Sequence, residues 1–96
     1  MSSNKNKPIL QELYAEIIKL ETMEEAESFL ADLCTINELE SMSQRITAAK
    51  MLLDGKTYNE IVEATDISTA TLARVSKCIR HGDGGYKTVL NKPNKK

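Results

Sequence analysis

Residues 57–80, TYNEIVEATDISTATLARVSKCIR, have a pattern that predicts two short helices joined by a tight turn. Thr57 precedes Glu60 at the spacing of a capping box, which starts the first helix. Ser68 can start the second helix, because its hydroxyl can accept a hydrogen bond from a free backbone N–H. Between the helices, Asp66 tolerates the left-handed backbone that a sharp turn needs. The stretch therefore predicts a helix-turn-helix.

The second helix of this stretch carries the residue types that a DNA-recognition helix uses. Its first turn holds short side chains that can approach base edges, and cations that can bind phosphates follow. Leu72, Val75 and Ile79 recur at helical spacing and would form its buried stripe, while Ile67 would fill the angle between the helices. The residues predicted to contact DNA are Lys56, Thr57, Tyr58, Ser68, Thr69, Ala70, Thr71, Arg74 and Lys77.

An alternative interpretation of the same stretch is an interaction module that binds a protein instead of DNA. Two amphipathic helices joined by a turn occur in many all-α domains. The net charge of −1 does not by itself favour a polyanionic partner. Two details of the stretch also depart from the usual pattern: Asp66 occupies a turn position where Gly is common, and Val62 lies where a small residue is expected. The pattern alone leaves both functions open.

The net charge conceals an asymmetry along the chain. Residues 1–40 hold three Lys and nine Asp or Glu, a net charge of −6, whereas residues 41–96 hold ten Lys or Arg and five Asp or Glu, a net charge of +5. Basic charge on the part that holds the helix-turn-helix favours phosphate binding. An alternative explanation of this charge asymmetry is attraction between an acidic and a basic half of the fold.

The rest of the chain predicts further helices and no strands. Gly55 is expected to end a helix over residues 35–53, and the glycines of residues 82–85 to end the second helix of the helix-turn-helix. Outside the helix-turn-helix, helices are expected over residues 8–20, 22–33, 35–53 and, as a short last one, 86–90. The fold class is thus all-α with five to six helices. One domain is expected over residues 8–90, with a disordered N-terminus in 1–7 and a basic tail in 91–96.

The helix over residues 35–53 is apolar on more than one side. Met51 and Leu52 broaden the apolar face beyond a single stripe, which suggests packing against more than its neighbours in the same chain. A second copy of the chain would supply that packing. The predicted core positions of this helix are Leu39, Met42, Ile46, Ala49 and Leu53.

Residues that could support catalysis or metal binding are too few for either prediction. Cys78 and His81 are spaced as C-x-x-H, but two ligands do not make a zinc site and no third group orients them for catalysis. Cys34 is the other cysteine, and it has no CxxC partner. No segment is apolar and long enough to span a membrane, and no secretory signal precedes the chain. We expect a reduced, cytoplasmic protein with no catalytic residues, no metal and no membrane partner.

Three segments carry a resemblance to a known family: TINELESMSQRITAAKMLLDGKTYNEI, STATLARV and RHGDGGY. In their order and residue types they resemble the Trp repressor superfamily, in particular its YerC/YecD-type branch. The resemblance implies an intertwined homodimer, with dimerising helices in residues 8–54, and a DNA-binding transcriptional regulator, specifically a repressor. Its partners would be itself and double-stranded DNA, with two recognition helices in successive major grooves of a pseudo-palindromic site.

The resemblance also locates a candidate effector pocket. The family's founding member binds tryptophan as corepressor through a Thr, two Arg and a Gly, and the matching positions here are Thr35, Arg45, Arg74 and Val75. Three match in type, but Val75 adds a side chain where Gly leaves room for the indole. No tryptophan cofactor is therefore expected. Arg45 and Arg74 would bind another small anion or pair with carboxylates of the fold, and the effector is unknown.

Overall fold

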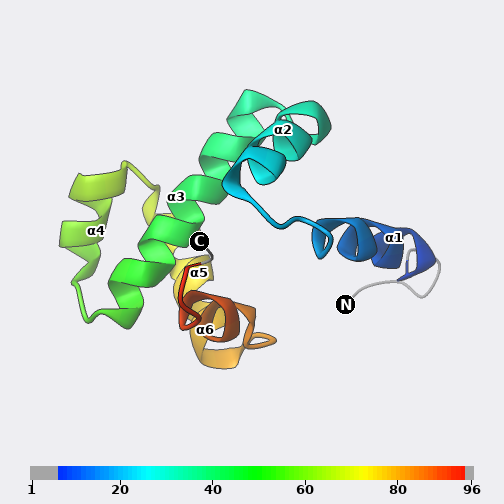
Figure 1. Ribbon diagram of the computed structural model, residues 1–96. Coiled ribbons are helices and arrows are strands. Elements are labelled where there is room, and N and C mark those ends of the chain that lie inside the picture. Colours follow the sequence, from blue (N-terminus) through cyan, green and yellow to red (C-terminus); the bar gives the residue numbers. More distant parts are fainter. Residues whose placement is uncertain (1–6, 95–96) are drawn as a thin grey trace. The chain divides into compact units, whose positions relative to one another are not determined.

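The structure is a computed structural model that describes residues 7–94, and six α-helices make up its regular structure (Figure 1). No strand occurs in this described range, so the predicted all-α class with five to six helices is confirmed. The helices are α1 (Lys7–Ile17), α2 (Met23–Leu33), α3 (Ile36–Leu53), α4 (Tyr58–Thr65), α5 (Thr69–His81) and α6 (Gly85–Leu90). Of the predicted disordered N-terminus, residues 1–6 lie outside the described range and Lys7 begins α1. The last two residues of the predicted basic tail also lie outside it.

The described chain divides into two units, residues 7–33 and residues 34–94. In the first unit, α1 and α2 bury none of their residues. Several of their large apolar side chains are exposed instead, with exposed fractions of 67% for Ile9 of α1 and 82% for Met23 of α2. In the second unit, α3 contacts α4, α5 and α6, and Figure 1 shows α4 and α6 on either side of it. The second unit therefore contains the core.

The core lies where α3, α4 and α5 meet. Ala48, Ile61, Ile67 and Leu72 form one buried cluster, and Met51, Leu52 and Val62 pack against it. Ile67 comes from the turn between α4 and α5, which is the position predicted for it from the sequence. Ala49 and Val75 are buried as well.

Part of the predicted core face of α3 remains exposed in the single chain. Ala49 is buried as expected, but Ile46 and Leu53 are 44% and 39% exposed. Leu39 and Met42 are half-buried. The prediction that these four side chains lie in the core is wrong for one chain alone, because the helices of this unit cover only part of the apolar surface of α3.

Two further T-x-x-E patterns, Thr22–Glu25 and Thr35–Glu38, stand at the starts of α2 and α3. Ahead of α3, the Thr35 hydroxyl accepts a hydrogen bond from the Glu38 N–H at 3.1 Å, and the Glu38 carboxylate accepts one from the Thr35 N–H at 2.8 Å. Ahead of α2 the arrangement differs, because the Glu25 carboxylate accepts from the N–H of Glu21 instead of that of Thr22. Both arrangements satisfy N–H groups that the first turn leaves free.

Gly55 ends α3 in a Schellman motif. Its φ of +88° is left-handed, which lets the N–H of Gly55 bond to the carbonyl of Leu52 and that of Lys56 to the carbonyl of Met51, both at 3.0 Å. The chain then turns directly into α4, so this glycine fixes where the helix-turn-helix begins.

Asp66 makes the turn between α4 and α5. Its φ of 60° is left-handed, and its N–H donates to the carbonyl of Val62 at 2.9 Å. The end of α4 is tied to α3, because the Gln44 amide donates to the Thr65 carbonyl at 2.9 Å. The Thr65 hydroxyl in turn accepts from the N–H of Ile67 at 3.2 Å. The turn is thus held from both sides by hydrogen bonds.

The left-handed turn gives a testable stability difference. Replacement of Asp66 by Ala is expected to destabilise the protein by about 1 kcal/mol relative to replacement by Gly, because a β-carbon disfavours this backbone and glycine accepts it. Urea denaturation of both variants measures the difference. Equal stability of Asp66→Ala and Asp66→Gly would contradict the left-handed turn.

Candidate nucleic-acid interface

Three residues, 66–68, separate α4 from α5, and this is the connection length typical of a helix-turn-helix. Leu72 and Val75, 0% and 1% exposed, anchor one face of α5 in the core. Ile61 of α4 is fully buried beside them in the same unit. The fold therefore holds α5 by one side and leaves its other side free.

Two hydroxyls at the start of α5 bind each other. The Ser68 hydroxyl accepts a hydrogen bond from the Thr71 N–H at 3.1 Å and donates one to the Thr71 hydroxyl oxygen at 2.9 Å. Ser68 thus caps the helix as predicted, and its hydrogen-bonding capacity is largely used within the chain. Thr69 and Ala70, the two residues between them, are exposed.

The free side of α5 combines methyl groups with cations. Thr69, Ala73 and Lys77 follow one another at intervals of one helical turn, and Ala70 and Arg74 lie beside them. All five are exposed. The helix contains no Asp or Glu, and within residues 7–94 neither Arg74 nor Lys77 forms an ion pair. Both positive charges therefore remain available to a partner.

Ala73 is a surface residue that the sequence analysis did not single out. Its helical spacing from Thr69 and Lys77 could have indicated that it lies on the exposed face of α5. Alanine also occurs in protein cores, as Ala48 and Ala49 show, so its type alone did not indicate the exposed face.

The start of α4 contributes three further predicted DNA contacts. Lys56 and Thr57 are exposed ahead of the helix, and Tyr58, its first residue, is 42% exposed. The Thr57 hydroxyl caps α4 by accepting the N–H of Glu60 at 3.2 Å, and the Glu60 carboxylate accepts the Thr57 N–H at 2.8 Å. The Thr57 hydroxyl also donates to the Glu60 carboxylate at 3.2 Å, and the two hydrogen bonds that this carboxylate accepts from Thr57, together with the charge of Lys56, lower the pKa of Glu60 below its usual 4.5.

The capping box of α4 should make stability depend on pH. A lowered pKa in the folded state means that Glu60 stabilises the fold fully above pH 4.5, and that this contribution is lost as the pH falls through the folded-state pKa. Glu60→Gln keeps an acceptor for the Thr57 N–H but does not titrate. We expect the stability advantage of the wild type over Glu60→Gln to shrink below about pH 4.5. Urea denaturation of both proteins between pH 7 and pH 3 measures it, and a pH-independent difference would contradict the assignment.

The four residues of the candidate effector pocket lie in different environments. Thr35 is engaged in the cap of α3, and Val75 is buried in the core. Arg45 lines a hollow of about 360 Å³ whose other walls come from Cys34 and α3 residues, namely Asn37, Glu38, Ser41 and Met42. Arg74 and Val75 of α5 do not line it. Within residues 7–94 neither Arg45 nor Arg74 forms an ion pair.

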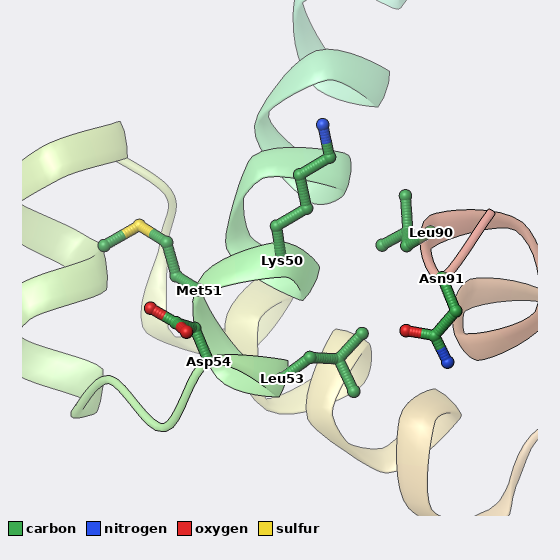
Figure 2. Close-up of a pocket in the computed structure, with 6 residues that line it drawn as sticks. All are labelled: Lys50, Met51, Leu53, Asp54, Leu90 and Asn91. Carbon is green, nitrogen blue, oxygen red and sulfur yellow. The ribbon is translucent and has the colours of Figure 1, made fainter. Parts of the chain in front are cut away.

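A further hollow lies between the C-terminal ends of α3 and α6 (Figure 2). It measures about 420 Å³ and is lined by Lys50, Met51, Leu53, Asp54, Leu90 and Asn91. Figure 2 shows Leu53 and Leu90 directed toward the space between the helices, whereas Lys50 and Asp54 extend in different directions. This mixture of one cation, one carboxylate, one amide and three apolar side chains does not assemble a catalytic group.

The described part of the chain also holds no group of three or more His, Cys, Asp or Glu side chains placed to bind a metal. Cys34 is half-buried and Cys78 is exposed, and both are free thiols. None of the helices in residues 7–94 is both long enough and apolar enough to cross a membrane.

Comparison with known proteins places this arrangement in a family. The sequence profile described as Trp repressor protein matches residues 9–94. The chain belongs to the Trp repressor family. The resemblance found in the sequence is thereby confirmed, and the helix-turn-helix is that of a family of DNA-binding regulators.

Individual relatives agree with this assignment. The uncharacterized protein YerC of Bacillus subtilis (strain 168) is 42% identical over 83 residues, which cover 86% of this chain and 80% of YerC. The crystal structure of a TrpR-like protein from Eubacterium eligens ATCC 27750 superposes with a TM-score of 0.85, at 43% identity over 92% of both chains. A candidate Trp repressor from Staphylococcus aureus superposes with a TM-score of 0.84, at 40% identity over 94% of this chain and 93% of the other.

Proposed function

We propose that the protein is a homodimeric, cytoplasmic transcriptional repressor that places the α5 helices of its two protomers in successive major grooves of DNA. The observation that carries the proposal is the free side of α5, which holds no carboxylate and presents Arg74 and Lys77 without an ion pair to any residue in 7–94. Such a surface suits a polyanion, and α5 occupies the position of a recognition helix in a family of DNA-binding regulators.

The exposed apolar surface of the single chain supports the dimer. α1 and α2 bury no residue, although their apolar side chains recur at helical spacing. Ile9, Ile18 and Met23 are 67%, 81% and 82% exposed, and Ile46 and Leu53 of α3 are partly exposed as well. Helices of this length are marginal in water without tertiary packing. A second copy of the chain would cover these surfaces, and an interlocked dimer is what the family resemblance implies.

The DNA affinity of such a dimer should depend on salt concentration in a defined way. Lys56, Arg74 and Lys77 from each of two protomers would neutralise about six phosphates, so the slope of log K against log salt should be about −5. A protein that binds DNA through apolar or shape contacts alone would show a much flatter dependence.

Fluorescence anisotropy titrations test the proposal directly. Labelled fragments of genomic DNA are titrated with the full-length protein at several salt concentrations, with an excess of unlabelled duplex as the competition control. We expect binding that weakens steeply with salt. Failure to bind any duplex at about 50 mM salt would contradict the proposal and would favour the protein-interaction alternative.

The proposal does not include tryptophan as corepressor. The Thr35 hydroxyl is already bonded within its capping box, and the Val75 side chain fills buried space in α5 where the family's pocket has glycine. Tryptophan at one hundred times its dissociation constant would stabilise a binding protein by about 2.7 kcal/mol. We expect no change in melting temperature with millimolar tryptophan, in the presence or absence of DNA. A rise of several degrees would contradict this expectation.

A further inference from the structure

The first two turns of α5 are unusual in what they offer to base edges. A helix in the major groove distinguishes bases by a small set of side-chain pairings: Asn or Gln with adenine, Glu or Asp with cytosine, Arg or Lys with guanine, and methyl groups with the C5 methyl of thymine. α5 contains no Asn, Gln, Asp or Glu, and its first cation is Arg74. The usual hydrogen-bonding partners of adenine and cytosine are therefore missing from this helix.

Two of the three hydroxyls at the start of α5 are engaged within the chain. Ser68 and Thr71 are bonded to each other, and Thr71 is half-buried. Besides Ser68, the residues exposed ahead of Arg74 are Thr69, with its hydroxyl and methyl groups, and Ala70 and Ala73. Thr69 and Ala73 lie one turn apart on the same side of the helix, with Lys77 one turn further along. The part of α5 that precedes its cations thus presents mainly methyl groups.

We infer that the protein recognises thymine in each half-site through its C5 methyl group, which the methyl group of Thr69 contacts, with Ala70 and Ala73 completing the apolar surface. The inference rests on the proposed function, since it assumes that α5 lies in the major groove. Arg74 and Lys77, further along the helix, bind phosphates and set its depth in the groove. Recognition then depends on burial of methyl groups, whereas affinity depends on charge.

Deoxyuridine provides a probe that removes only the methyl group. A duplex is first selected from a random-sequence library by the full-length protein. It is then resynthesised with deoxyuridine in place of one thymidine at a time. Deoxyuridine keeps the base pair with adenine but lacks the C5 methyl. We expect at least one position per half-site where the substitution weakens binding about fourfold, and about 15-fold when the equivalent positions of both half-sites are replaced.

Two matched variants of Thr69 separate a direct contact from an effect on DNA shape. Thr69→Ser keeps the hydroxyl and loses the methyl, whereas Thr69→Val keeps the methyl and loses the hydroxyl. At the sensitive position we expect Thr69→Ser to bind the thymidine and deoxyuridine duplexes equally, and Thr69→Val to keep the wild-type preference. Circular dichroism confirms that both variants are folded.

Three results would overturn the inference. If deoxyuridine has no effect at any position while the protein still selects a duplex, the inference fails and the proposed function stands. If the preference for thymidine persists unchanged in Thr69→Ser, the methyl acts through the shape of the DNA instead of through Thr69. If the library yields no bound duplex even at low salt, the proposed function fails and the inference fails with it.

Discussion

Reversal of both charges on the free side of α5, in the double variant Arg74→Glu with Lys77→Glu, is expected to lower DNA affinity about 1,000-fold at about 0.1 M salt. Both side chains are exposed and unpaired within the described residues, so nothing in the described chain compensates for their loss. In a dimer the change removes four phosphate contacts. The slope of log K against log salt should therefore fall by about 3.6. Anisotropy titrations at several salt concentrations measure both quantities.

A charge-matched variant serves as the control for this prediction. Lys7→Glu with Lys19→Glu changes the net charge by the same amount, but on exposed residues at the start of α1 and two residues after its end. It also breaks the exposed ion pair between Lys19 and Glu16, which is worth little to stability. We expect this control to bind DNA within about tenfold of the wild type, because neither lysine is among the predicted DNA contacts. An affinity of the α5 variant equal to that of the control would contradict a role of α5 in phosphate binding.

Leu72→Ala is expected to cost about 3 kcal/mol of folding stability, which is a large part of the total of about 5–15 kcal/mol for a domain. Leu72 is 0% exposed and packs in the cluster with Ala48, Ile61 and Ile67. Its removal leaves a cavity at the point where α5 is anchored. The melting temperature should fall by about 15 °C, and DNA binding should be lost as α5 detaches.

The conservative substitution Leu72→Met distinguishes the effect of lost packing volume from the effect of replacing leucine by another residue. Methionine has nearly the same volume, so we expect a cost below about 1.5 kcal/mol. Urea denaturation followed by circular dichroism gives both values. If Leu72→Ala were no more destabilising than Leu72→Met, the position of Leu72 in the core would be wrong.

Much of the second unit could be predicted from the sequence, because local chemistry fixes it. The capping boxes of Thr35 and Thr57 each need only a hydroxyl and a carboxylate three residues apart, and both occur in the structure. Gly55 and Asp66 mark the two left-handed positions that end α3 and α4. Ile67, the apolar residue of the turn, is buried because the turn points it between the helices.

Other features depend on packing between distant parts of the chain or between molecules, which local sequence patterns do not reveal. Helical periodicity identified the apolar face of α3, but not that Ile46 and Leu53 would be left partly exposed by the helices of their own chain. The same periodicity does not tell which molecule covers such a face. Ala73 was missed because alanine fits buried and exposed positions equally well.

The start of α5 shows how a side chain predicted to face DNA can be engaged within the chain. Ser68 was expected both to cap the helix and to face base edges. The structure uses its hydroxyl for the cap and for a hydrogen bond to Thr71. That bond depends on the exact residue at which the helix begins, which propensities locate only to within a few residues. Whether Thr69 then determines specificity is a question for the deoxyuridine duplexes.

Hydroxyl-radical footprinting of the library-selected duplex can show whether two α5 helices of one dimer bind successive major grooves. We expect two protected patches on one side of the DNA, with centres about 10 base pairs, or one helical turn, apart. Protection should disappear with Arg74→Glu and Lys77→Glu and persist with Lys7→Glu and Lys19→Glu. A single protected patch, or two patches whose centres are half a turn apart, would contradict binding of a dimer in successive grooves.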